Sequence, residues 1–235
     1  MYTIVDRVGS SRTDTNGIMR LSGAIDVIQD CSLLWMESEP SVRAFFEANN
    51  MRMFIASRQI DIIRLPVHGE NIAVQTRVYE CRRSFGYRNT VMYGGDGRPC
   101  VMTWCIGAFV NMETGKMARL PQEEIDRVTI DEKFDMEYLD KKISLPGIPA
   151  RSLNAFPVRR SDIDLNHHMN NAKYIEAAME FLPEDFAVRR LRIEYKAPAK
   201  LGELLYPLLV EGPDGKWYVL LTDSQNAPFT VMEFS

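Results

Sequence analysis

Two sequence patterns occur twice in this chain, in the same order, and predict a duplicated fold. The first pattern, D-x-N-x2-M-x5-I-[D/E], is matched at Asp14, Asn16, Met19, Ile25, Asp26 and at Asp164, Asn166, Met169, Ile175, Glu176. The second, I-[D/E]-x7-G-E, is matched at Ile60, Asp61, Gly69, Glu70 and at Ile193, Glu194, Gly202, Glu203. Self-similarity of this kind indicates two copies of one structural unit.

Each copy is predicted to begin with a helix. Apolar residues follow helical spacing from Met19 to Pro40 and again from Met169 to Pro183. A proline stops a helix because it lacks the backbone N–H and clashes with the preceding turn. Either Asn170 or Asn171 fits the N-cap position of the second helix.

Strand-like segments follow each helix. They are residues 58–64, 72–79, 87–93 and 100–112 in the first copy, and 191–196, 204–210, 217–222 and 229–234 in the second. Short turns join successive strands, which predicts antiparallel meanders, since parallel neighbours need long crossovers. One helix over one face of each sheet gives the α+β class. We expect domains at 1–120 and 150–235, joined by a charged surface linker at 121–149.

Composition excludes several classes of protein. The chain is 46% hydrophobic and 26% charged, which is typical of a packed globular protein and not of a disordered one. A net charge of -4 with interspersed signs predicts neither nucleic acid nor a membrane as partner. The absence of a long apolar run or a signal-peptide layout predicts a cytoplasmic protein. The chain has only three histidines, His68, His167 and His168, so no metal or other cofactor is expected. Its four cysteines, Cys31, Cys81, Cys100 and Cys105, include no C-x2-C pair, so they are expected to be free buried thiols.

The two copies differ in chemistry just before the helix. The first reads Asp-Thr-Asn-Gly-Ile-Met from residue 14, and the second reads Asp-Leu-Asn-His-His-Met from residue 164. An imidazole has an ordinary pKa of about 6.5, so His168 could act as a general base or acid, Asp164 could orient it or bind water, and Asn166 could hold substrate. A helix N-terminus nearby would stabilise an oxyanion. The same Asp and Asn residues also suit a purely structural role as caps or Asx-turns.

The run from Arg160 to Ile175 resembles the active-site segment of the acyl-ACP thioesterases of plant plastids and bacteria. The similarity extends through residues 11–13, the helix after Met19 and the strand near Ile60. This resemblance implies two tandem hotdog domains, each a long helix wrapped by an antiparallel sheet. It also implies hydrolysis of the thioester that joins a fatty acyl chain to the phosphopantetheine arm of acyl carrier protein.

The family's catalytic D-x-N-x-H arrangement falls on Asp164, Asn166 and His168, with His167 at the intervening position. Plant members also carry a Glu-Cys pair after a strand similar to residues 193–195. Carried over without a gap, that pair falls on Pro198 and Ala199, which favours activated water over a cysteine nucleophile.

Substrate-binding residues are expected in both domains. Backbone N–H groups around Asn170 and Asn171 are candidates for steadying an oxyanion. The resemblance places chain-length selection mainly in the first domain, where Trp35 and Met36 could line an acyl tunnel or simply pack in the core.

Other interpretations stay open. Basic residues could meet an acidic carrier protein or form an ordinary solvated face: Arg82, Arg83, Arg88, Arg189, Arg190, Arg192, Lys196 and Lys200. Acyl-CoA could replace acyl-ACP as the substrate, or the chain could be a non-catalytic acyl-thioester-binding protein. A homodimer is also open.

Overall fold

The computed structural model describes all 235 residues. The chain divides into two compact units, Met1–Tyr138 and Leu139–Ser235. This division lies inside the segment 121–149 that the sequence analysis treats as a linker. Each unit is described below by itself.

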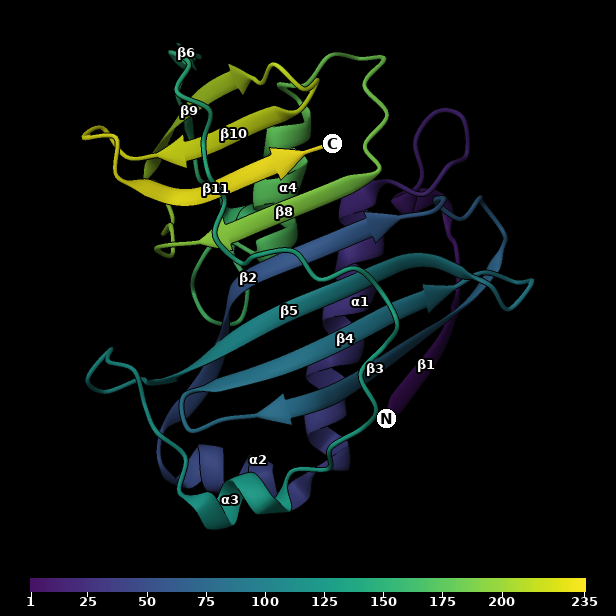
Figure 1. Ribbon diagram of the computed structural model, residues 1–235, viewed down its shortest axis with the longest axis vertical. Helices are drawn as coiled ribbons and strands as arrows, with labels where there is room; N and C mark the ends of the chain where they lie inside the picture. Colours follow the sequence, from purple (N-terminus) through teal and green to yellow (C-terminus); the bar gives the residue numbers. More distant parts are fainter. The chain divides into compact units, whose positions relative to one another are not determined.

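The first unit is a five-stranded antiparallel sheet with a helix packed on one face (Figure 1). Its elements are β1 (Tyr2–Arg7), the 3₁₀ turn η1 (Ser10–Arg12), α1 (Leu21–Leu34), the 3₁₀ turn η2 (Trp35–Ser38), α2 (Pro40–Ala48), β2 (Met51–Ile62), β3 (Asn71–Cys81), β4 (Phe85–Tyr93), β5 (Pro99–Asn111) and α3 (Gln122–Arg127). The strand order is β1-β3-β4-β5-β2. Figure 1 shows α1, in purple, behind these strands.

The second unit repeats this plan on a smaller scale. Its elements are β6 (Arg151–Ser152), β7 (Phe156–Pro157), the 3₁₀ turn η3 (Arg160–Asp162), α4 (Asn171–Met179), β8 (Arg190–Tyr195), β9 (Leu204–Glu211), β10 (Trp217–Thr222) and β11 (Pro228–Phe234). The strands run in the order β8-β11-β10-β9-β6, and β7 also pairs with β9. In Figure 1, α4 lies in green behind this sheet. The α+β prediction is therefore confirmed.

Strand connectivity departs from a simple meander in both units. The strands β3, β4 and β5 follow one another as expected, but β2 pairs with β5 and not with β3. Likewise β8 pairs with β11 and not with β9. Turn residues fix only the hairpins, and the strand after each helix takes its neighbour from tertiary packing. The N-terminal strand β1, paired with β3, has no counterpart among the predicted strands.

The buried face of each helix follows the apolar spacing of the sequence. In α1, Ala24, Ile25, Ile28 and Cys31 are completely buried, as residues three and four apart on one helix face should be. α1 ends at Leu34, earlier than Pro40 suggests, because a 3₁₀ turn intervenes and Pro40 instead opens α2. Proline fits the first turn of a helix, where its missing N–H has no partner to lose.

Most of the segment 121–149 packs onto a unit and does not form a free connector. It contains α3, and Val128 joins an apolar cluster of the first unit with Phe46 and Phe109. The Phe134 N–H donates to Asn89 Oδ1 (3.1 Å). From Leu139 onward the segment belongs to the second unit.

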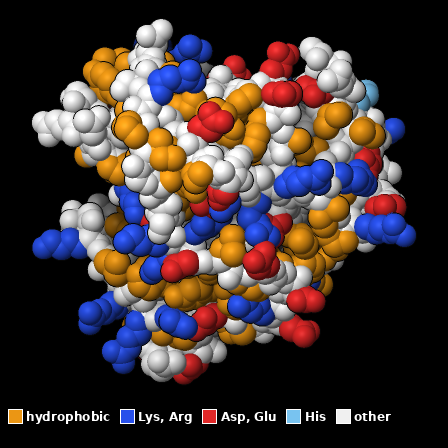
Figure 2. Space-filling view, turned by 45° about the horizontal axis from the view of Figure 1, so that its top comes forward, with side chains coloured by type: hydrophobic (Ala, Val, Ile, Leu, Met, Phe, Trp, Pro, Cys, Tyr) orange, Lys and Arg blue, Asp and Glu red, His pale blue; other side chains and the backbone are white.

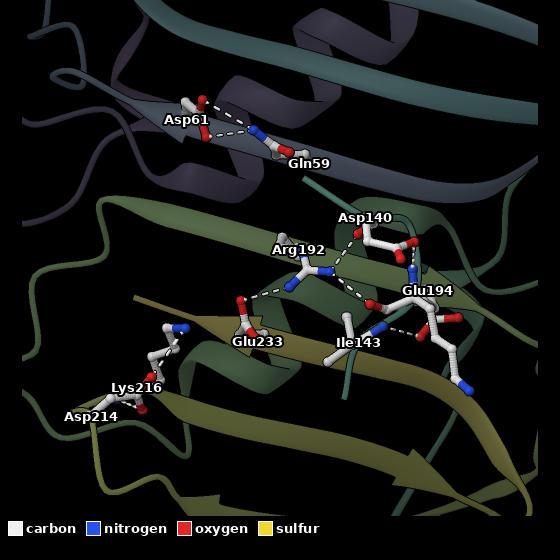
Figure 3. Close-up of polar contacts among 10 residues, drawn as sticks. Gln59, Asp61, Asp140, Ile143, Arg192, Glu194, Asp214, Lys216 and Glu233 are labelled. Carbon is white, nitrogen blue, oxygen red and sulfur yellow. Dashed lines mark hydrogen bonds and ion pairs between the residues drawn. The ribbon is translucent and has the colours of Figure 1, made fainter. Parts of the chain in front are cut away.

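Arg192 on β8 holds the first residues of the second unit against the sheet through hydrogen bonds (Figure 3). It donates to the carbonyl oxygens of Asp140 and Lys142 and forms an ion pair with Glu233 (3.0 Å). Glu194 Oε1 accepts the Ile143 N–H (2.8 Å). This contact gives Glu194 a structural role in the second unit.

All four cysteines are free, three of them buried and Cys81 half-buried. None of the helices combines the length and the hydrophobicity that a membrane-spanning helix requires. Basic and acidic side chains lie interspersed with hydrophobic ones on the face shown in Figure 2.

Candidate active site

The loop between η3 and α4 holds Asp164, Asn166 and His168. Its two ends are tied by a bridge between Ile163 and Met169. Inside the loop the Asp164 N–H donates to the His168 carbonyl (2.9 Å), and Asp164 Oδ1 accepts the Asn166 N–H (2.7 Å). These contacts form an Asx-turn, so the structural role that the sequence left open for Asp164 is present.

The first unit has the same loop with different chemistry. There the Asp14 N–H donates to the Ile18 carbonyl (2.8 Å), and Asp14 Oδ1 accepts the Asn16 N–H (2.9 Å). Both loops place one residue in the left-handed region, Gly17 at φ 74° and His167 at φ 60°. The backbone is thus repeated, and the imidazoles are the difference.

The three candidate side chains are half-buried, whereas His167 is exposed. His168 stands at the position of Ile18 in the first unit, and its Nδ1 atom is buried. Half-burial suits a catalytic group, because the group must reach solvent or substrate while a lower local dielectric strengthens its electrostatic interactions. Of the two histidines, His168 therefore has the more suitable position, as the D-x-N-x-H pattern predicts.

Asn170 performs a structural task at the start of α4. Its Oδ1 accepts the Ala172 N–H (2.8 Å), which makes Asn170 the N-cap. Its own N–H donates to the Asp162 carbonyl (2.7 Å). That N–H, which the sequence analysis names as a candidate oxyanion donor, is thus already engaged by the backbone. The Asn171 carbonyl accepts a hydrogen bond from the Tyr195 hydroxyl (3.3 Å).

Residues 198 and 199, where plant relatives are expected to carry Glu-Cys, lie directly beside this loop. The Ala199 carbonyl accepts the Met169 N–H (2.8 Å), and Ala199 itself is fully buried. When the family's Glu-Cys pair is aligned with this chain without a gap, its cysteine therefore falls on Ala199. This position lies next to the candidate site, and its side chain has no nucleophilic atom. Pro198 is exposed.

Tyr174 was missed as a polar contributor because it fits the apolar pattern of α4. Its hydroxyl accepts the Ala199 N–H (2.8 Å) and so holds the 198–199 turn against the helix. Burial raises the pKa of Tyr174 to about 12, and the charges of Glu203 and Asp164 act in the same direction. The signal available in the sequence was a tyrosine on the buried helix face, since a buried hydroxyl needs a partner.

A groove of about 500 Å³ runs along the outer side of α4. Its apolar lining includes Phe156, Phe181 and Met169, the residue after His168. The rings of Phe156 and Phe181 lie 6.1 Å apart between centroids.

Trp35 and Met36 belong to the first unit. Trp35 is buried in the apolar cluster with Phe46 and Phe109, and Met36 packs against that cluster. Arg88 was expected to lie at the surface but is only 3% exposed. Its guanidinium carbon lies over the Trp35 ring, 4.4 Å from the ring centroid. Arg82 and Arg83 are exposed.

The two units, each an antiparallel sheet packed against a helix, define a tandem hotdog protein. Solved structures support this class. An acyl-ACP thioesterase from Bacteroides thetaiotaomicron covers 99% of this chain and 96% of its own, with a TM-score of 0.87 and 21% identity. The 12:0-ACP thioesterase from Umbellularia californica covers 100% and 96%, with a TM-score of 0.82 and 15% identity.

Sequence comparison then identifies the family. Residues 6–128 match the acyl-ACP thioesterase N-terminal domain and residues 148–211 match the acyl-ACP thioesterase C-terminal domain. The chain belongs to the acyl-ACP thioesterase family, as its sequence resemblance predicted. The chloroplastic acyl-[acyl-carrier-protein] hydrolase FATB2 of Cuphea viscosissima is 27% identical over 177 residues, which are 70% of this chain. This chain spans 42% of the length of that relative.

Proposed function

We propose that this protein hydrolyses the thioester of a fatty acyl group carried by acyl carrier protein. The observation that carries the proposal is the loop before α4, which has the same backbone hydrogen bonds as its counterpart in the first unit but adds His168. Membership of the acyl-ACP thioesterase family supports the substrate class.

The proposed reaction uses water as the nucleophile. His168 takes a proton from water, whose oxygen adds to the thioester carbonyl carbon, and the C–S bond then breaks. The proton passes from His168 to the departing thiolate, which gives a free fatty acid and the thiol of the carrier's phosphopantetheine arm. Asn166 positions the water or the carbonyl, and Asp164 holds the loop and orients the imidazole.

A covalent route through residue 199 has no support in this chain. Ala199 has no nucleophilic atom, and its backbone N–H and carbonyl are engaged by Tyr174 and Met169. This arrangement favours activated water, as the sequence analysis predicts.

The direct test is His168→Ala assayed on acyl-ACP. Loss of a general base typically lowers turnover by about 10²- to 10⁴-fold. We expect a loss of that size with unchanged circular dichroism and urea midpoint. The matched control is His167→Gly, which removes the neighbouring imidazole and copies Gly17 of the first unit. Near-normal hydrolysis by His168→Ala would contradict the assignment.

The carrier is tested with one acyl chain presented on acyl carrier protein and on coenzyme A. We expect a higher kcat/KM for the carrier protein. Equal or higher kcat/KM for the CoA ester would show an acyl-CoA thioesterase of the same fold. Ligand binding without release of a thiol would show a binding protein.

A further inference from the structure

Two arginines on neighbouring strands lie inside the first unit. Arg58 on β2 and Arg88 on β4 each stand directly opposite Cys105 of β5, so the three side chains share one face of the sheet. Directly opposed residues of antiparallel strands project to the same side. Each arginine is only 3% exposed.

This face is the one covered by α1. Arg88 Nη1 donates to the Ser32 carbonyl of α1 (2.7 Å) and to Thr76 Oγ1 (3.3 Å). The Arg88 guanidinium also stacks on Trp35, directly after α1. Both partners that accept hydrogen bonds from Arg88 are neutral.

Several donor atoms of this arginine pair have no partner in the chain. Arg58 Nε, Arg58 Nη1 and Arg88 Nε are buried without a hydrogen-bond acceptor. Neither guanidinium forms an ion pair with a carboxylate. The neighbouring Cys31 supplies no anion either, because burial raises the pKa of its thiol to about 11.

A guanidinium group stays charged in proteins at neutral pH. Burial lowers the pKa of Arg88 to about 10, and the charge of Arg58 acts in the same direction, yet the group stays protonated at neutral pH. An unpaired buried charge destabilises a fold. Apolar side chains at these two positions would pack the interior without that penalty. The arrangement calls for an anion supplied from outside the chain.

The surroundings of the pair indicate the rest of the ligand. Trp35, which Arg88 covers, belongs to an apolar cluster with Val78 and Phe109. Val78 stands directly opposite Arg88 on β3. A ligand that reaches the guanidiniums would contact apolar side chains and then two cations, which fits an aliphatic chain ending in a carboxylate.

We propose that Arg58 and Arg88 form a binding site for the carboxylate end of an aliphatic chain inside the first unit. This inference rests on the proposed function, which supplies an acyl chain. The carboxylate has two sources: the far end of an acyl group that carries a second carboxyl, or the free fatty acid released by hydrolysis. Guanidinium suits this task because it is weakly hydrated and presents planar donors to carboxylate oxygens.

The test is isothermal titration calorimetry on the full chain with decanoate, decanedioate and the neutral 1-decanol. Because a hydrogen bond to a charged group contributes about 1.5–3 kcal/mol, we expect the carboxylates to bind at least about tenfold tighter than the alcohol. Arg58→Met should abolish this preference, and Arg58→Lys should retain part of it. The control Arg43→Met, which removes an exposed arginine of α2, should behave as the native protein. Equal binding of decanoate and 1-decanol, or an unchanged preference in Arg58→Met, would overturn the proposal.

A second measurement separates binding from folding. Without ligand, Arg58→Met should keep or raise the urea midpoint, because it removes an uncompensated buried charge. A large fall in the midpoint of the ligand-free protein would show that Arg58 serves the fold, and would overturn the proposal.

The two sources are distinguished with thioether analogues of acyl-pantetheine, which cannot be hydrolysed. Tighter binding of the analogue with a distal carboxyl, lost in Arg58→Met, identifies a dicarboxylic acyl substrate. Arg58-dependent binding of decanoate alone identifies the released fatty acid. Neither readout requires turnover, so failure of the hydrolysis assay and failure of this proposal can be told apart.

Discussion

At the scale of single residues, the repeated positions are the ones that shape turns. Gly69 and Gly202 adopt φ of 81° and 82°, which favours glycine. Glu70 Oε2 accepts the Val67 N–H (3.0 Å), and Glu203 Oε2 accepts the Lys200 N–H (2.7 Å). The patterns recur because the turns recur. Residues with a catalytic role are therefore expected at the positions where the two copies differ.

Glu70 also forms an ion pair with Arg64, which donates a hydrogen bond to each of its two carboxylate oxygens. The Arg64 guanidinium lowers the pKa of Glu70 to about 2, below its ordinary 4.5. A lowered pKa means that the folded state favours the carboxylate. Its contribution is fully present above about pH 4.5 and is lost as the pH falls toward 2.

We expect Glu70→Gln to have a lower urea midpoint than the native protein at pH 7. Near pH 2.5 the midpoints of the two proteins should lie closer together, because the native protein then begins to lose the contribution of the Glu70 carboxylate. Salt should reduce the effect, because Arg64 is 40% exposed. The control is Glu203→Gln, which removes no arginine pair. A pH-independent difference for Glu70→Gln would contradict this interpretation.

At the scale of elements, the two helices start differently although their loops match. Asn170 caps α4 through its side chain, whereas Arg20, the equivalent residue, makes no side-chain cap on α1. α4 has only 9 residues against 14 in α1. A short helix depends more on its cap, because fewer internal hydrogen bonds offset the cost of nucleation.

Asn170→Ala is expected to destabilise the protein by about 1 kcal/mol in urea unfolding, since the Ala172 N–H loses its acceptor. Asn170→Asp should retain most of the stability, because aspartate also caps helices. If Asn170→Ala keeps native stability but loses hydrolysis, Asn170 acts on substrate and not as a cap.

At the scale of the whole molecule, the chain passes from one unit to the next through a segment that is built into both. The residues before Leu139 pack on the first unit, and those after it are held by Arg192 of β8. The Arg192 and Glu233 side chains are 12% and 6% exposed, so their ion pair is largely buried.

Arg192→Met should destabilise the protein by about 3 kcal/mol, because the Glu233 carboxyl group is left buried without this partner. The double variant Arg192→Met, Glu233→Met should be more stable than the single one. Lys216→Met, which breaks the exposed pair with Asp214 shown in Figure 3, should change stability by less than about 1 kcal/mol. Urea midpoints of the four proteins test this, and a double variant no more stable than Arg192→Met would refute it.

The amino-acid pattern alone was enough to predict the duplication, the positions of most strands, and the loop that joins Asp164, Asn166 and His168. These features are local, since apolar periodicity and turn residues act over a few positions of the chain. The family resemblance added the hotdog fold, which the structural comparisons bear out. The catalytic roles of these three residues stay a prediction, and so do those of Asn171, Trp35 and Met36 toward substrate.

Which residues from distant segments meet could not be predicted from these local patterns and follows from how the elements pack. Tertiary packing placed β2 beside β5, bonded Tyr174 to Ala199, and buried Arg58 together with Arg88, which the sequence had placed among the surface basic residues. Such contacts join positions tens of residues apart, and they follow from how whole strands and helices pack. No short-range pattern encodes them, because the same side chain is stable at a surface or in a core depending on what covers it.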